Sequence, residues 1–238
     1  MDSPGYTSLT RQSGLLREMQ AVANNIANIS TTGFRREGLL FAEHVAALEP
    51  GEPSLSMANA SVRHTDTGQG PLTQTGGTFD FAIEGDGFFM LETADGLHLT
   101  RAGSFTPGAE GELMAPDGAR LLDAGGAPIF VPPDARDVSL APDGTLSADG
   151  RPLTQIGLVT PADINDLTRA QGVRFAVEGD VEPVEGAVIL QGFVEKSNVD
   201  PVTEIARMIE VQHAYQMGQK FLDREDERIR AVIQTLGR

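Results

Sequence analysis

The chain has 238 residues, of which 40% are hydrophobic and 5% aromatic, with 27 glycines and neither tryptophan nor cysteine. Its formal net charge of −16, with no local basic patch, argues against partners such as nucleic acid or an anionic membrane. The lack of cysteine excludes disulfides and cysteine-bound metals, and no segment resembles a cleaved signal peptide or a membrane-spanning helix.

Residues 1–33 are predicted to form an amphipathic helix, because apolar side chains recur with helical spacing. The expected stripe occupies heptad positions a (Leu9, Leu16, Ala23), d (Gln12, Met19, Ile26) and g (Leu15, Val22, Ile29). Ser30, Thr31 and Thr32 then have the chemistry of a turn, and Gly33 is interpreted as the residue that terminates the helix.

Three asparagines, Asn24, Asn25 and Asn28, lie opposite this stripe, although asparagine has a poor helix propensity. No charged residue occurs between Met19 and Phe34. A polar but uncharged face is typical of lateral packing in an assembly, because an amide binds a neighbour without the desolvation cost of an ion. We therefore expect these asparagines to contact neighbouring molecules; a solvated face is the alternative.

Residues 34–75 are interpreted as an extended connector, since the part from about residue 46 onward is rich in Gly, Pro, Ser and Thr. Residues 76–196 are predicted to form a glycine-rich antiparallel β domain. Short apolar runs alternate there with turns, and Asp-Gly, a strong hairpin signal, occurs five times. The interval 46–196 carries eight basic and 23 acidic side chains, so it holds nearly all the net charge.

Residues 197–238 are predicted to form the second helix, with Asp200 as its cap and Pro201 as its first residue. Its stripe consists of Met208, Val211, Tyr215, Leu222, Ile229, Val232 and Leu236. A lone amphipathic helix cannot bury its stripe. The predicted fold is therefore mainly β with terminal α-helices, and these helices pair as a coiled coil with the β domain inserted between them.

No pattern in the sequence predicts a catalytic, metal or cofactor site. The four histidines lack the spacing of metal ligands, and neither a phosphate-binding glycine loop nor a nucleophile elbow occurs. The turn at residues 84–87 has two carboxylates but no EF-hand ligand pattern. We expect no enzyme activity. A secreted β-domain enzyme or glycan-binding protein is the alternative, and it requires convergent acids or aromatics within residues 76–196.

Three segments resemble, in the correct order, motifs of the bacterial flagellar basal-body rod and hook protein family. The first is AlaAsnAsnIleAlaAsn with SerThrThrGlyPheArgArg at 23–36, which includes Thr31, Gly33 and Phe34. The second comprises residues 81–89 and 99–105, with Ile83, Gly85, Asp86, Gly87, Phe88, Phe89, Arg101, Gly103 and Phe105. The third comprises residues 197–205 and 208–217, with Asn198, Val199, Asp200 and Pro201.

From the heptad pattern we expect the helix seam and assembly contacts to consist of Leu9, Leu16, Met19, Ile26, Met208, Val211, Tyr215, Leu222 and Ile229. The resemblance implies a structural subunit that polymerises helically through its terminal helices. It also implies export through the flagellar type III apparatus, a place in the periplasmic rod, and partners among copies of the chain and other rod proteins, the distal one included. Length and the single β region are most similar to the proximal rod type. A distal rod or hook-type subunit, and an assembly chaperone or cap, are the alternatives.

Overall fold

The computed structural model describes residues 3–46, 55–184 and 186–236, and it divides the chain into two compact units. The helical unit consists of α1 (Ser3–Ala27), β1 (Glu37–Ala46), β2 (Leu55–Thr65) and α2 (Pro201–Leu236). The β unit consists of residues 28–35 and 67–198. The described chain is thus mainly β with one N-terminal and one C-terminal α-helix, which confirms this part of the predicted fold class.

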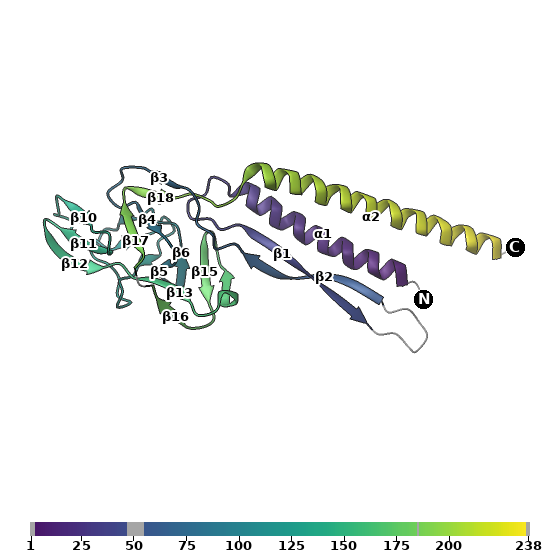
Figure 1. Cartoon of the computed structure of the whole chain (residues 1–238), viewed down its shortest axis with the longest axis horizontal. Helices are drawn as coiled ribbons and strands as arrows, with labels where there is room; N and C mark the ends of the chain where they lie inside the picture. The colour runs from purple at the N-terminus through teal and green to yellow at the C-terminus, as the bar shows by residue number, and fades with distance from the viewer. Residues whose placement is uncertain (1–2, 47–54, 185, 237–238) are drawn as a thin grey trace. The chain divides into compact units, whose positions relative to one another are not determined.

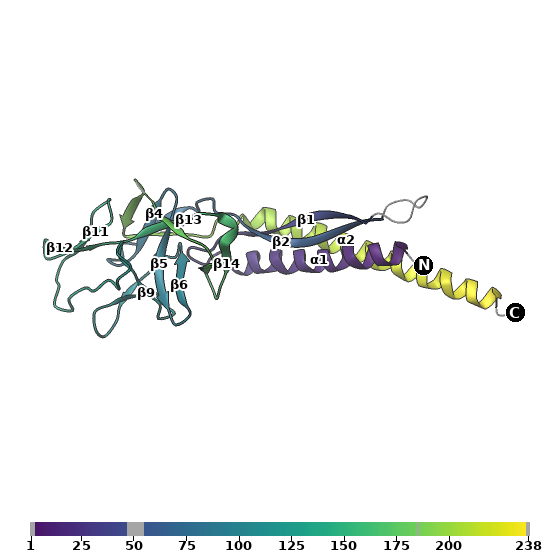
Figure 2. The same ribbon diagram turned by 90° about the horizontal axis from the view of Figure 1, so that it is seen from below.

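In the helical unit, α1 contacts both α2 and the hairpin formed by β1 and β2 (Figures 1 and 2). The hairpin is antiparallel, from Glu37 opposite Thr65 onward, with a register shift between Leu40 and Phe41. Residues 34–75 are interpreted from the sequence as an extended connector, whereas the structure has this paired hairpin within that range. α1 therefore has two neighbours within the chain, α2 and the hairpin, whereas the sequence predicts only α2.

Helix boundaries follow local chemistry. α1 ends at Ala27, six residues before Gly33, and a turn follows in which the Thr31 amide donates to the Asn28 carbonyl at 3.1 Å. Gly33 is thus not the residue next to the helix end. α2 starts at Pro201, and Asp200 Oδ1 accepts from the Thr203 amide at 2.7 Å, as expected for a capping residue.

The β unit contains short strands. They are β3 (Leu72–Gln74), β4 (Phe81–Glu84), β5 (Phe88–Thr93), β6 (Gly96–Thr100), β7 (Thr106–Pro107), β8 (Leu113–Met114), β9 (Arg120–Leu121), β10 (Val138–Leu140), β11 (Thr145–Ala148), β12 (Arg151–Gln155), β13 (Leu158–Pro161), β14 (Leu167–Arg169), β15 (Arg174–Val177), β16 (Val181–Pro183), β17 (Val188–Gln191) and β18 (Phe193–Glu195), with the 3-10 helix η1 (Ile164–Asp166).

The largest sheet runs β14-β15-β6-β5-β9-β8-β7, and β13 pairs with β5 and β16 beside this path. β10, β11 and β12 form a second sheet, while β17 pairs with β4 and β18 with β3. All of these pairings are antiparallel, as the Asp-Gly turns predict. At the β11–β12 turn, Asp149 (φ 50°) and Gly150 (φ 76°) both have positive φ, which a tight type I′ hairpin requires.

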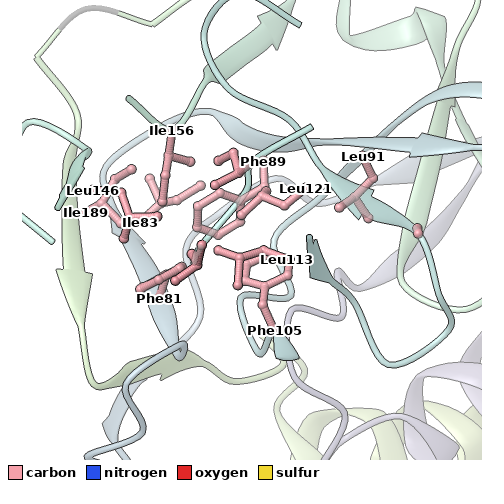
Figure 3. Packing of buried hydrophobic residues seen from close by; sticks show 13 residues of the cluster. Phe81, Ile83, Phe89, Leu91, Phe105, Leu113, Leu121, Leu146, Ile156 and Ile189 are labelled. Carbon is pink, nitrogen blue, oxygen red and sulfur yellow. The ribbon is translucent and has the colours of Figure 1, made fainter. Parts of the chain in front are cut away.

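The hydrophobic core lies on both faces of β5. Phe89 and Leu91 belong to one buried cluster, and Phe88 and Met90 belong to another, because successive side chains of a strand point to opposite faces. In the first cluster, shown in Figure 3, the Phe105 ring lies 5.6 Å from the Phe89 ring between centroids and nearly perpendicular to it. This two-sided burial explains why residues 88–91 are uniformly apolar.

Candidate functional site

The two terminal helices pack against each other in antiparallel directions. Cross-helix hydrogen bonds give the register: Asn25 donates to Glu204, Arg207 to Glu18, Gln12 to the Tyr215 carbonyl, and Gln219 to Gln12. On α2, Val211 is buried, and Met208, Tyr215 and Leu222 are half-buried on the same side. The predicted stripe of α2 therefore faces α1 over this part of its length.

The buried face of α1 is rotated about the helix axis relative to the predicted stripe. Leu9 and Leu16, at the a positions, are 57% and 44% exposed, while Leu15 and Val22, at g, are buried. Met19 and Ile26 are half-buried. The physical reason is that α1 packs on the hairpin as well as on α2, so its buried face is displaced from the a/d seam. Leu9 and Leu16 do not belong to the helix contact within the chain.

Polar side chains occupy part of the helix contact. Arg207 Nε donates to Glu18 Oε1 at 2.7 Å. Burial acts to lower the pKa of Arg207, but its hydrogen bonds to Glu18 and Glu210 outweigh burial, so the pKa is raised.

Gly218 explains the interruption of the apolar series on α2. A Cβ at this position would lie 3.0 Å from Nε2 of the buried Gln12, so glycine makes room for that amide.

Asn25 is fully buried and forms the centre of a polar cluster in the helical unit. Its Nδ2 donates to the Glu37 carbonyl at 2.8 Å and to Glu204 Oε2 at 3.2 Å, and its Oδ1 accepts from the Glu37 amide at 2.9 Å. Glu204, also buried, forms an ion pair with Arg36. The expected contact of Asn25 with a neighbouring molecule is thus wrong, because the hairpin supplies its partner within the chain.

The other two asparagines are half-buried. Asn24 Nδ2 donates to Glu37 Oε2 at 3.4 Å, and Asn28 Oδ1 accepts from Thr31 Oγ1 at 3.1 Å. Both have hydrogen bonds inside the chain and remain partly exposed, so lateral contacts of these two asparagines stay a prediction.

The end of the N-terminal motif is tightly packed in the β unit. Gly33 has φ 69°, and a Cβ there would lie 2.2 Å from the Ala102 nitrogen, so only glycine fits. Phe34 is buried, and the Arg169 guanidinium lies 4.5 Å from its ring centroid and 4.9 Å from that of Phe175. This motif therefore anchors residues 28–35 to the β strands.

A buried charge cluster holds several distant segments of the β unit together. Glu195 accepts from Arg35 Nη2 at 2.7 Å, from Arg101 Nη1 at 3.3 Å and from the Gly70 amide at 2.6 Å. All three side chains are at most 2% exposed. Burial lowers the pKa of Arg101 to about 10, although Glu195 raises it, so Arg101 remains charged at neutral pH. Two cations thus share one carboxylate.

The central motif serves the fold of the β unit. Ile83, Phe88, Phe89 and Phe105 are core residues, and Gly85 and Gly87 have φ near 107° in the turn around Asp86. Arg101 Nη2 donates to the Gly85 carbonyl at 2.7 Å, which ties this turn to the charge cluster. Gly103 is required by close approach, because a Cβ there would lie 1.7 Å from the Phe81 carbonyl oxygen.

The C-terminal motif leads into α2. Asn198 Nδ2 donates to the Gly68 carbonyl at 2.9 Å, and Val199 is buried. Asp200 and Pro201 form the helix start described above, and hydrogen bonds from Thr203 to the Asp200 carboxylate lower its pKa. Ile229, the last predicted seam residue, is 36% exposed.

Neither helix, over the residues that the structure describes, has a stretch long and apolar enough to span a membrane. Within the same residues, no group of three or more His, Asp or Glu side chains is arranged to hold a metal ion. Glu18, Glu195 and Arg207 were not predicted as functional residues, and Glu204 was expected only as an acidic residue in the first turn of the second helix. Their contacts have no local signal, because each depends on a partner far along the chain.

Comparison with known proteins gives a family match for each of the three segments that carry the motifs. Family models match residues 6–35 (Flagella basal body rod protein), 82–148 (Flagellar hook protein FlgE/F/G D1 domain) and 190–235 (Flagellar basal body rod FlgEFG protein C-terminal). The flagellar basal-body rod protein FlgF of Caulobacter vibrioides is 38% identical, covering 100% of this chain and 99% of the relative. The chain belongs to the flagellar basal-body rod protein family.

Two further relatives extend this finding. FlgF of Mesorhizobium japonicum is 35% identical and covers 98% of this chain and 97% of its own length. The flagellar basal-body rod protein FlgG of Bacillus subtilis is 31% identical, covering 96% of this chain and 97% of the relative. Family membership makes the chain a structural protein of the flagellar basal body and not an enzyme, in agreement with the prediction, and it implies assembly with other rod and hook proteins.

Proposed function

We propose that this chain is a proximal rod subunit of the FlgF type that polymerises through its terminal helices. The observation that carries the proposal is the exposed apolar surface of the helix pair in a chain that matches FlgF relatives over its whole length. Leu9, Leu16, Ile205 and Ile209 are each between 44% and 57% exposed on helices whose opposite sides are buried. Such surfaces in a soluble subunit favour packing against further protein.

The more specific features of this function are proposed from the family resemblance. We propose that the helix pair extends as a coiled coil in the assembled rod, that the subunit is exported through the type III apparatus without a cleaved signal peptide, and that it functions in the periplasmic rod. The proposed partners are copies of the chain and other rod proteins, including the distal one. We also propose the division into terminal axial helices at 1–33 and 197–238, a connecting segment at 34–75 that contains the hairpin of β1 and β2, and a β domain at 76–196.

A distal rod subunit is the second candidate, supported by the 31% identity to FlgG of Bacillus subtilis. Mass spectrometry of basal bodies purified from the source bacterium distinguishes the candidates. A proximal subunit stays with fragments that end below the distal rod, a distal subunit is lost with the upper rod, and an assembly chaperone is absent from all fragments.

Complementation of a deletion strain tests the role of the helices. Leu16→Asp should abolish motility and incorporation into the rod, because it places a charge on a surface proposed to become buried. The matched control is Leu153→Asp in β12, where the leucine is also exposed, at 36%. If Leu16→Asp supports normal motility, or if the deletion itself leaves rod and hook intact, the proposed function is incorrect.

A further inference from the structure

The inner stripe of α2 continues beyond the part that α1 covers. Gln12 lies against Gly218 in the antiparallel pair. Continuing this register back along α1 places Ser3, the first described residue of that helix, close to Glu227 on α2. Figures 1 and 2 both show α2 extending past the start of α1. The last turns of α2 therefore have no α1 residue opposite them among those that the structure describes.

These last turns present apolar side chains on the same face as the buried part of the stripe. Ile229 follows Leu222 by one heptad, and Val232 follows Val211 by three. Ile229, Val232 and Ile233 are 36%, 47% and 63% exposed, in contrast to the buried Val211. We call these three residues the α2 overhang. It is a direct continuation of the helix interface that already exists within the chain.

A complementary surface lies on the outer side of α1. Leu9, Leu16 and Ala23 recur at intervals of seven residues, and all are exposed. Ser13, Gln20 and Ala27, which border them on one side, are uncharged, and the exposed Arg17 lies beyond Ser13 and Gln20. We call Leu9, Leu16 and Ala23 the α1 outer strip. Its residues repeat every seven positions, about 10 Å along the helix axis, and the same interval relates Leu222 to Ile229 on α2.

We propose that the α2 overhang of one copy packs on the α1 outer strip of a second copy. The inference rests on the proposed function and specifies its contact. The overhang extends the surface with which α2 already packs against an α1 helix. The partner that fits this surface is therefore another α1 helix. The contact is heterologous, because it joins two different surfaces. Every copy carries both surfaces, so each copy that is added still has one unoccupied surface for the next copy. The result is an open assembly.

Cysteine cross-linking tests the contact directly, because the chain has no cysteine of its own. Leu16→Cys is prepared in one batch of the full chain, and Ile229→Cys and Ile233→Cys in others. Under mild oxidation we expect disulfide-linked dimers when the α1 variant is mixed with either overhang variant, and none from a single variant alone. Arg224→Cys, on an exposed side of α2 away from the stripe, is the matched control and should not cross-link with Leu16→Cys.

A second measurement covers the case in which disulfide geometry is unfavourable. Leu16→Asp and Ile233→Asp chains, each folded by circular dichroism, should be monomeric alone in analytical ultracentrifugation. Mixed, they should form one-to-one dimers and nothing larger, because the mixture retains one intact overhang and one intact strip. Failure of both the cross-link and the mixed dimer overturns the inference, and so does cross-linking of a single variant with itself, which indicates a symmetric contact.

The outcome is separable from that of the proposed function. If the chain is present in purified basal bodies but neither mixed experiment succeeds, the rod assignment stands and this contact is wrong. If the mixed dimers form but the chain is absent from basal bodies, the contact stands and the rod assignment is wrong. Contact of the overhang with a different rod protein corresponds to the first of these results.

Discussion

Replacing Glu195 by glutamine is expected to destabilise the β unit strongly. Glu195 is fully buried and is the shared anionic partner of Arg35 and Arg101. Three nitrogens of these arginines, Nε and Nη1 of Arg35 and Nε of Arg101, already lack a hydrogen-bond partner among the described residues. Glutamine keeps the size of the side chain but removes the charge, which leaves two buried cations uncompensated.

The magnitude follows from this burial. Removing one member of a buried ion pair costs about 3–5 kcal/mol, and a unit of this size loses about 3 °C in melting temperature per kcal/mol, so we expect a decrease of roughly 10 °C. The control is Glu112→Gln, which removes a pair with Arg120 at 3.2 Å whose carboxylate side chain is 29% exposed. Such a surface pair contributes about 0–1 kcal/mol.

Differential scanning calorimetry of the full chain gives the two melting temperatures. Hydrogen exchange of peptides from β4 to β6 then assigns the transition to the β unit rather than to the helices. Equal melting temperatures for Glu195→Gln and Glu112→Gln would refute the reasoning, because they would mean that the buried carboxylate does not compensate the two arginines.

Three further substitutions have defined outcomes. Asn25→Ala leaves buried backbone and carboxylate groups unpaired and should cost about 2–4 kcal/mol in chemical denaturation, whereas Asn24→Ala should cost less than about 1 kcal/mol, and equal losses would contradict the polar cluster. Gly33→Ala should raise hydrogen exchange in the β unit because it collides with backbone at a positive φ, whereas Gly38→Ala, with its nearest atom at 3.9 Å, should not. The pKa of Asp200 is lowered in the folded chain, so its carboxylate fully stabilises the start of α2 above the unfolded pKa of about 3.9, and this stabilisation is lost as pH falls through the folded pKa. Hydrogen exchange at the helix start should therefore increase at low pH. Asp200→Asn should keep the cap and remove this pH dependence.

Features that depend on neighbouring residues could be predicted from the sequence. The start of α2 is marked by Asp200 and Pro201, whose side chains act on the adjacent backbone. β5 is marked by the run from Phe88 to Leu91, and the turn at Asp149 and Gly150 by its Asp-Gly pair. In each of these cases the energetic cause lies within a few residues, so a single sequence contains it.

Features that depend on a third element could not be predicted. The sequence indicates which face of α1 is apolar, but the position of Asn25 depends on whether anything packs on the other face. Because residues 34–75 have the composition of a connector, the hairpin was not expected, and the partner of Asn25 at Glu37 was missed with it. The pairing of Arg35 with Glu195 joins residues 160 positions apart, and no local pattern marks it.

The polar contacts of the helix pair also determine which part of α2 stays exposed. Apolar periodicity alone permits a shift by one heptad, because Leu222 and Ile229 occupy equivalent positions. That shift would bury the exposed third of Ile229, for a gain of about 1 kcal/mol. It would also take the buried Glu204 carboxylate away from Asn25 and from Arg36, whose side chain is 36% exposed. Leaving a buried carboxylate without its hydrogen-bond partners costs about 1–3 kcal/mol, and more when the group is charged. The observed register is therefore favoured by its charges, and these charges keep the α2 overhang available to a second chain.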